Sequence, residues 1–309
     1  MKGPSFFAKI LLFGEYGIIK DSKGLSIPYN FFRGMLKWTE EETEATRISH
    51  QSLCDYTEYL KGLPEELLRF DWEALHADLD LRLYFDSSIP QGYGVGSSGA
   101  LVAAFYDRYA VDKISPQADL IPEKLSRLKS IFAAMESYFH GQSSGLDPLN
   151  SYLSLPLLIH SKDKIETTGI PAQNAQGKGG VFLIDSGSSG ATAPMVSLFL
   201  ENMKEEAFRK MMRDEFAKMT DRCVENFLKG NLKSLLSDMK SLSALVLQYF
   251  KPMIPAEFHE LWKKGLETNA YYLKLCGSGG GGYVLGFTQD LEAAQKALQG
   301  YRLEVVHYF

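Results

Sequence analysis

Residues 90–99 read Pro-Gln-Gly-Tyr-Gly-Val-Gly-Ser-Ser-Gly. A strand-like run at 81–87 precedes them, and residues 100–109 follow with strong helix character. A glycine loop between a strand and a helix suits a polyphosphate, because its backbone N–H groups and the positive helix end both attract anions. The loop has neither the Gly-Lys-[Ser/Thr] of a Walker loop nor the spacing of a dinucleotide fingerprint. Taken alone, it is explained equally well as a tight strand-to-helix connection.

A second glycine loop lies near the other end of the chain. Residues 274–283 read Lys-Leu-Cys-Gly-Ser-Gly-Gly-Gly-Gly-Tyr, so five of the six residues from Gly277 are glycine. Each glycine costs about 0.5–1 kcal/mol relative to alanine in regular structure, and packing alone rarely requires so many. This loop therefore also favours close approach of the backbone to a ligand.

Short apolar runs and helical periodicities alternate along the chain and predict an α+β fold. Glycines at 177–180 precede a new strand, and we place a domain junction there, giving domains 1–175 and 176–309. The predicted strands are 10–13, 16–20, 81–87, 181–184, 272–275, 283–287 and 303–308, and the predicted helices include 100–109, 125–139, 194–218, 232–249, 257–270 and 290–299.

Composition limits the classes of function. The chain has 309 residues, 45% of them hydrophobic, and a formal net charge of −5 with scattered lysines. We expect no nucleic-acid partner, because no broad basic face is indicated. We also expect no membrane span, because no apolar run is long enough. Three widely spaced cysteines (Cys54, Cys223 and Cys276) fit neither a disulfide framework nor a zinc site, which favours a cytoplasmic location.

Four segments together resemble a known family. Residues 7–15 (Phe-Ala-Lys-Ile-Leu-Leu-Phe-Gly-Glu), 90–99 and 274–283 are similar, in this order, to the three motifs of the GHMP kinases. Residues 136–147 (Glu-Ser-Tyr-Phe-His-Gly-Gln-Ser-Ser-Gly-Leu-Asp) resemble the mevalonate kinase form of that family. The resemblance implies a ribosomal S5 domain 2-like N-terminal domain and a ferredoxin-like C-terminal domain.

The resemblance also implies roles for individual residues. Asp147 would be the catalytic carboxylate, Lys9 its cationic neighbour, and Ser98 with Glu136 the Mg²⁺ ligands. These types suit phosphoryl transfer, which needs a proton acceptor, positive charge near the phosphoryl oxygens and oxygen ligands for Mg²⁺. The residues implied for ATP phosphate binding are Gly92, Gly94, Gly96, Ser97, Ser98, Gly99, Gly277, Ser278, Gly279 and Gly280.

Substrate contacts are implied at Glu15, Tyr16 and Thr192. Tyr16 stands where mevalonate kinases commonly have histidine. Two of the proposed site residues have simpler interpretations: Asp147 precedes Pro148 and could start a turn, and Glu136 could lie on a solvated helix face.

The implied activity is a small-molecule kinase that converts ATP and mevalonate, a small hydroxylated acid, to ADP and 5-phosphomevalonate. Other GHMP kinases, acting on phosphomevalonate, homoserine or a sugar, are alternatives. A phosphorylated substrate would need a further cationic cluster, for which only Lys20 and Lys23 are candidates. A non-catalytic nucleotide-binding regulator and a decarboxylating relative are further alternatives, and a homodimer is left open.

Overall fold

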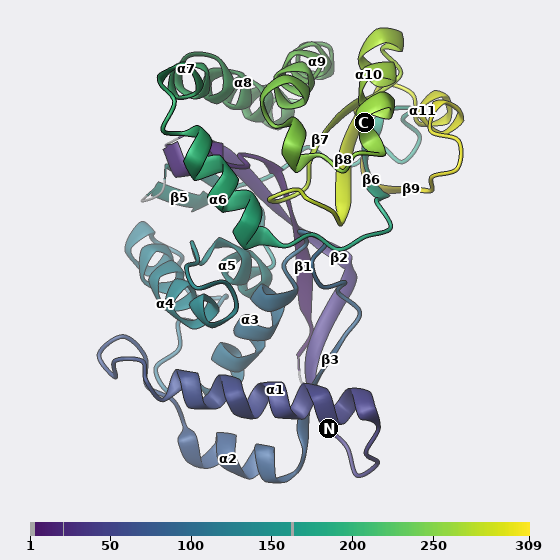
Figure 1. Cartoon of the computed structure of the whole chain (residues 1–309). Coiled ribbons are helices and arrows are strands. Elements are labelled where there is room, and N and C mark those ends of the chain that lie inside the picture. The colour runs from purple at the N-terminus through teal and green to yellow at the C-terminus, as the bar shows by residue number, and fades with distance from the viewer. Residues whose placement is uncertain (1–3, 21, 162–163) are drawn as a thin grey trace. The chain divides into compact units, whose positions relative to one another are not determined.

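A computed structural model describes residues 4–20, 22–161 and 164–309 (Figure 1). The side chain of Lys20, a candidate cation for a phosphorylated substrate, lies outside the described part. The chain forms two compact units. Unit 1 contains the residues up to Lys9, Ile27–Gln91 and Gly96–Leu155, and unit 2 contains Ile10–Ser26, Gly92–Val95 and Pro156–Phe309. The chain leaves unit 1 for the last time after Leu155, which precedes the junction predicted at residue 175. That junction stays a prediction.

Unit 1 combines an antiparallel strand pair with five helices. Within it, the second half of β2 (Gly24–Trp38) pairs with β3 (Leu83–Ser87), from Gly34 opposite Ser87 to Trp38 opposite Leu83. The helices are α1 (Glu44–Leu60), α2 (Trp72–Asp80), α3 (Ser97–Tyr109), α4 (Pro122–His140) and α5 (Leu146–Leu153). α1 packs on β3, and α3 packs on α5 and α4.

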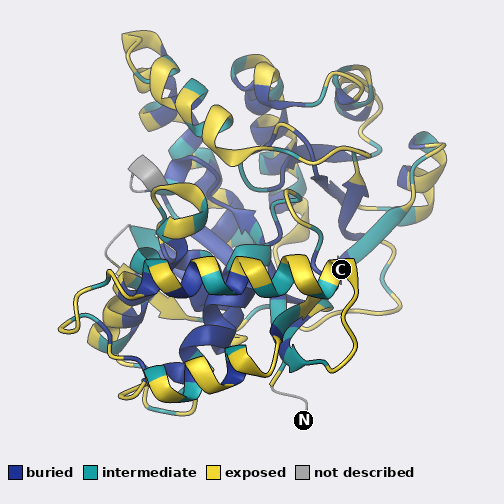
Figure 2. Cartoon of the chain, turned by 60° about the horizontal axis from the view of Figure 1, so that its bottom comes forward, coloured by how far each residue is buried: buried dark blue, intermediate teal, exposed yellow. Residues whose placement is uncertain are grey.

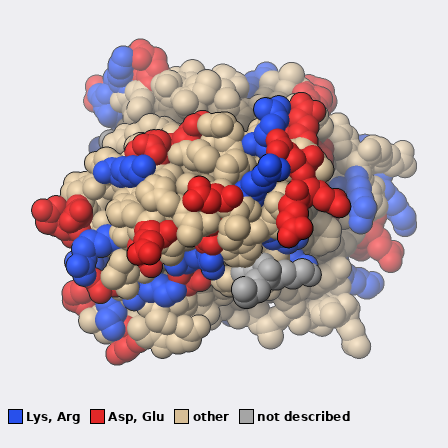
Figure 3. All heavy atoms as spheres, turned by 90° about the horizontal axis from the view of Figure 1, so that it is seen from below, with Lys and Arg blue, Asp and Glu red and all other residues tan. Residues whose placement is uncertain are grey.

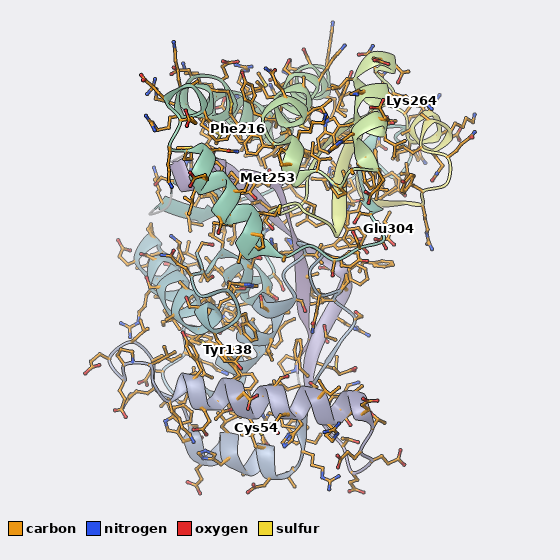
Figure 4. All side chains as sticks on the ribbon, viewed as in Figure 1. Cys54, Tyr138, Phe216, Met253, Lys264 and Glu304 are labelled. Carbon is orange, nitrogen blue, oxygen red and sulfur yellow. The ribbon has the colours of Figure 1, made fainter. Side chains whose placement is uncertain are left out.

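Burial distinguishes the partly exposed α1 from the central helix of unit 1. α1 is amphipathic and begins with a capping box at Thr43. Figure 2 shows exposed and buried residues alternating along this helix. Its buried Tyr56 lies 5.2 Å, between ring centroids, from Tyr138 of α4 (Figure 4). α3, in contrast, is buried over the whole stretch from Gly99 to Tyr106. A helix that is apolar on all sides belongs in a core, so α3 is the central helix of unit 1.

Unit 2 contains a four-stranded antiparallel sheet in the order β7-β8-β6-β9. Along the chain the elements run β6 (Gly180–Asp185), several helices, β7 (Tyr272–Leu275), β8 (Tyr283–Thr288), α11 (Leu291–Ala297) and β9 (Leu303–Tyr308). This is the βαββαβ topology of ferredoxin-like domains, which confirms that part of the predicted fold. α9 (Leu232–Tyr249) and α10 (Phe258–Thr268) contact β7 (Figure 1).

Strands of unit 2 also belong to a second sheet. The second sheet has the order β1-β2-β4-β5, and here the start of β2 pairs with β4 (Leu157–Ser161), which pairs with β5 (Lys164–Thr167). β1 (Phe6–Phe13) and β2 each pass from one unit into the other. The remaining elements are η1 (Gly17–Lys20), α6 (Thr192–Asn202), α7 (Glu206–Met211), the π-helical η2 (Met212–Phe216), α8 (Ala217–Leu228) and η3 (Lys251–Met253).

Two predicted elements are wrong. Residues 16–20 were expected to form a strand, but Gly14 and Tyr16 have φ values of 112° and 57°, and the chain turns into η1 instead. The single helix predicted at 194–218 is interrupted after Asn202. There the guanidinium of Arg209 donates to the carbonyl oxygens of Met203 and Lys204, at 2.9 and 2.5 Å, and so satisfies carbonyl groups at the end of α6.

The surface agrees with the mixed charge of the sequence. On the face seen in Figure 3, Lys and Arg side chains are interspersed with Asp and Glu. In the described part of the chain, no helix has the length and apolar character needed to cross a membrane.

Candidate active site

The centre of the candidate site is an ion pair in unit 1. Lys9 lies on β1 with 4% of its surface exposed, and its Nζ is 3.0 Å from Oδ1 of Asp147. Asp147 lies in the first turn of α5, and its side chain is 37% exposed. A buried lysine needs a partner, and this carboxylate is one. The pair therefore presents a carboxylate to solvent with a fixed positive charge behind it.

Glycines allow three backbones to meet at this pair. A Cβ on Gly99 would lie 2.8 Å from the carbonyl carbon of Asp147, so only glycine lets the start of α3 approach α5 this closely. Gly96, the N-cap of α3, has φ 81°, and a Cβ there would lie 3.0 Å from Cγ of Lys9. Gly145, the N-cap of α5, also has a left-handed φ of 72°. These glycines thus bring two helix N-termini to the Lys9–Asp147 pair.

The start of α3 has the properties of an anion site. Its N-cap is a glycine and makes no side-chain capping hydrogen bond. The first N–H groups of a helix, here those of Ser97, Ser98 and Gly99, have no acceptor within the helix, and the helix dipole adds positive potential. Phosphate oxygens are suitable acceptors for such groups.

A second cluster of polar side chains, also in unit 1, lies around Glu136 of α4. Its Oε1 accepts a hydrogen bond of 2.9 Å from the Ser98 hydroxyl, and its Oε2 accepts one of 2.5 Å from Ser143. Nε2 of His140 lies 3.1 Å from the Ser98 oxygen. When the Ser98 proton goes to Glu136, the His140 contact requires a proton on Nε2. This network fixes the rotamers of Ser98 and Glu136.

Burial dominates the electrostatics of Glu136. The side chain is 4% exposed, and burial followed by the negative charge of Asp147 raises its pKa to about 7. Hydrogen bonds from Ser143 and Ser98 and the charge of Lys9 oppose this rise in pKa. A nearby cation would favour the ionised carboxylate in the same way.

The Ser98–Glu136 pair fits the donor chemistry of Mg²⁺. It offers one hydroxyl and one carboxylate oxygen in hydrogen-bond contact, and Mg²⁺ bound with nucleotides takes few protein ligands, the rest coming from phosphate and water. No group of three or more His, Cys, Asp or Glu suited to a metal occurs among the described residues.

The glycine-rich segments of unit 2 pack backbone against backbone. A Cβ on Gly94 would lie 2.4 Å from the carbonyl oxygen of Cys276, and one on Gly282 would lie 2.5 Å from Cα of Tyr93. The Gly190 N–H donates to the carbonyl of Gly92 at 2.8 Å. Some of these glycines therefore serve close packing between loops. Gly277, Gly279 and Gly280 all have positive φ values, near 74–79°.

The predicted substrate residues Glu15, Tyr16 and Thr192 also lie in unit 2. Glu15 is buried and forms an ion pair with Lys274. Tyr16 is 6% exposed, and its hydroxyl donates to the carbonyl of Ser278 at 2.6 Å. Thr192 is exposed at the start of α6, and its Oγ1 is 3.4 Å from the Ser278 hydroxyl. Their role in substrate binding stays a prediction.

The predicted site residues thus form two groups, one in each unit. Lys9, Asp147, Ser98 and Glu136 come together in unit 1 around the glycines at the start of α3. The group in unit 2 contains Gly92, Gly94, Gly277, Ser278, Gly279, Gly280, Glu15, Tyr16 and Thr192.

Three participants had no role assigned from the sequence. Ser143 holds Glu136, His140 contacts Ser98, and Lys274 pairs with Glu15. Two of these could have been found from the sequence. His140 lies one helical turn after Glu136, on the same helix face. Lys274 interrupts an apolar strand, where a lysine needs a partner.

Two family models match the chain. The model of the GHMP kinases N-terminal domain matches residues 59–154, and that of the GHMP kinases C-terminal domain matches residues 223–305. Together they cover more than half of the sequence. No curated protein sequence matches it significantly.

Solved structures agree on the fold. Mevalonate kinase of L. major in complex with R-mevalonate is 18% identical with a TM-score of 0.63, covering 99% of this chain and 97% of that one. Lactococcus lactis galactokinase complexed with galactose is 14% identical with a TM-score of 0.64, covering 98% and 93%. Streptococcus pneumoniae phosphomevalonate kinase is 14% identical with a TM-score of 0.58, covering 98% of each chain. The predicted two-domain α+β fold is confirmed.

Proposed function

The chain belongs to the GHMP kinase family of ATP-dependent small-molecule kinases, and we propose that it phosphorylates mevalonate at its 5-hydroxyl. The observation that carries the proposal is the Lys9–Asp147 pair, with 3.0 Å between Nζ and Oδ1. Its half-exposed carboxylate lies at the start of two helices, where a phosphate and a hydroxyl can meet.

Each residue of unit 1 has a defined task in the proposed reaction. Asp147 accepts the proton of the acceptor hydroxyl, whose oxygen forms a bond to the γ-phosphorus of ATP while the bond from that phosphorus to the ADP oxygen breaks. Lys9 orients Asp147, and it offsets negative charge on the phosphoryl group. The N–H groups of Ser97, Ser98 and Gly99 bind phosphate oxygens.

Ser98 and Glu136 would hold Mg²⁺, which neutralises phosphate charge during such transfers. The hydrogen bonds from Ser143 to Glu136 and from His140 to Ser98 orient both oxygens.

Mevalonate is preferred over other acceptors on two grounds. The spacing from Glu136 through His140 to Asp147 resembles the mevalonate kinase form, and a mevalonate kinase bound to R-mevalonate is among the similar structures. A regulator without catalysis is less well supported, because nucleotide binding alone does not require a carboxylate held against a buried lysine. The homodimer stays a prediction.

The experiment is acceptor-dependent ADP release from Mg·ATP, with mevalonate, phosphomevalonate, homoserine and galactose compared by kcat/KM. We expect mevalonate to give the highest value. A higher kcat/KM for another acceptor would refute the mevalonate assignment while leaving the kinase assignment in place. ATP binding without turnover on any of the four would favour the regulator.

A further inference from the structure

The turn that follows β1 in unit 2 holds an unfavourable backbone conformation. Tyr16 has a φ of 57°, in the left-handed region that bulky residues rarely adopt, and Gly14, two residues earlier, has a φ of 112°. Such a conformation persists only where surrounding contacts impose it, and these positions often serve function. The contacts of Glu15 and Tyr16 therefore impose this conformation.

Glu15 and Tyr16 both contact the segment around the glycine loop of the third family motif, Gly277–Gly282, which is named the third glycine loop. Glu15 forms an ion pair with Lys274, and both side chains are almost fully buried, with 7% and 2% exposed. The Lys274 ammonium also donates to the carbonyl of Leu275 at 2.9 Å. A buried pair of this kind tolerates little displacement, because separation would leave a charge without its partner. It ties the turn to β7 at the base of the loop.

Tyr16 contacts the loop itself. Its hydroxyl donates to the main-chain oxygen of Ser278 at 2.6 Å, and its ring centroid lies 4.6 Å from that of Phe199 and 5.7 Å from that of Phe250. Burial raises the pKa of the phenol, so the hydroxyl remains a donor. Phe216, labelled in Figure 4, lines the same small apolar cavity as Tyr16. The aromatic packing therefore fixes the direction in which the Tyr16 hydroxyl points.

The third loop has little stiffness of its own. All five of its glycines have positive φ values. Glycine allows such values without strain but also allows many others, so the conformation must be imposed from outside. One external contact is the hydrogen bond from the Gly280 N–H to the carbonyl of Met253, at 2.7 Å. The Tyr16 hydroxyl supplies another at Ser278.

We propose that Glu15 and Tyr16 clamp the third glycine loop and that Tyr16 is a positioning residue for this loop, in place of the acceptor contact that the sequence suggested. The clamp follows from the contacts alone. Its consequence for ATP rests on the proposed function, in which the loop binds phosphate. In that case the Tyr16 hydroxyl lowers the KM for ATP by holding the loop in its binding conformation.

The first test is hydrogen–deuterium exchange of the full chain without ligands. Tyr16→Phe removes only the hydroxyl, and we expect exchange in the peptide spanning 277–283 to speed up about five- to tenfold, the effect of one lost hydrogen bond on local opening. Tyr271→Phe is the matched control, because it removes a similar bond, from the Tyr271 hydroxyl to the carbonyl of Leu261 at 2.8 Å, elsewhere in unit 2. Unchanged loop exchange in Tyr16→Phe, or an equal increase in the control, would overturn the clamp.

The second test separates positioning from acceptor binding. In Tyr16→Phe we expect the KM for ATP to rise about five- to tenfold while the KM for the acceptor stays unchanged. A rise in the acceptor KM alone would make Tyr16 a substrate contact and refute the positioning role. If the wild-type chain turns over no acceptor, the proposed function fails, and the exchange experiment still decides the clamp.

Discussion

The Lys9 ammonium lies 3.0 Å from the Asp147 carboxylate, and the two groups differ sharply in exposure: the lysine side chain is 5% exposed and the aspartate side chain 37%. The positive charge is therefore fixed inside unit 1, and the negative charge is available to a ligand. A carboxylate that a buried cation holds in place and that a ligand can reach has the position that a general base requires.

Replacing Asp147 with asparagine tests its role as the base. We expect kcat to fall about 10²- to 10⁴-fold, the usual contribution of general-base catalysis, with little change in ATP affinity. Steady-state kinetics and nucleotide titration measure the two quantities. Asp71→Asn, at the N-cap of α2, is the control, because it removes a carboxylate from the start of another helix in unit 1. An equal loss of ATP affinity and of kcat/KM would contradict a role confined to catalysis.

Replacing Lys9 with methionine should separate activity from stability. We expect turnover to be lost, while the free energy of unfolding changes by no more than about 1 kcal/mol, because removing the lysine leaves an aspartate that water can reach. Urea unfolding and the ADP-release assay measure the two effects. Full activity in the methionine variant would show that the cation is dispensable.

Glu136 should make stability depend on pH. Its pKa is raised from 4.5 to about 7 in the folded chain, so the folded state binds the proton more tightly than the unfolded state. The stabilisation is fully present below pH 4.5 and is lost as the pH rises to about 7. The loss amounts to about 3 kcal/mol.

Glu136→Gln should abolish this dependence in urea unfolding measured with EDTA between pH 4.5 and 8. Glu123→Gln, at an exposed position of the same helix, is the control. Parallel stability–pH curves for Glu136→Gln and wild type would show that the buried carboxyl does not cause the pH dependence of stability.

Gly99→Ala should damage the site without touching a reactive group. The added Cβ would lie 2.8 Å from the backbone at Asp147 and Pro148, so α3 and α5 must separate. We expect a loss of about 1–3 kcal/mol in stability and a lower kcat. Thermal unfolding and kinetics test this, with Gly169→Ala as the control, because nothing lies within 4 Å of a Cβ at Gly169. Wild-type behaviour of Gly99→Ala would mean that the helices accommodate the methyl group.

Elements with a clear local signal could be predicted from sequence. The glycine loop before α3, the apolar period of α4 and the C-terminal strands 272–275 and 303–308 agree with the structure within a few residues. The ferredoxin-like topology came from the family resemblance, since strand order depends on contacts between distant segments. The candidate site was located through the same resemblance, and the structure adds the contact between Lys9 and Asp147.

The errors have physical reasons. Ile18 and Ile19 suggested a strand, but Tyr16 adopts a left-handed conformation that contacts around Ser278 and Phe199 impose. The end of α6 depends on the Arg209 side chain, which donates hydrogen bonds to carbonyl oxygens six and five residues earlier in the chain. Ser143 could not be assigned from sequence, because its bond to Glu136 depends on how the loop after α4 folds back. Local pattern carries no information on such contacts.

The most direct test of the account is ³¹P NMR of wild type and Asp147→Asn incubated with Mg·ATP and R-mevalonate. We predict that the wild type produces a new phosphomonoester signal on the 5-hydroxyl oxygen, in step with the loss of the γ-phosphate signal of ATP, and that the variant produces it about 10²- to 10⁴-fold more slowly. No mevalonate phosphate from the wild type would contradict the acceptor assignment, and an equal rate in both proteins would contradict the role of the Lys9–Asp147 pair.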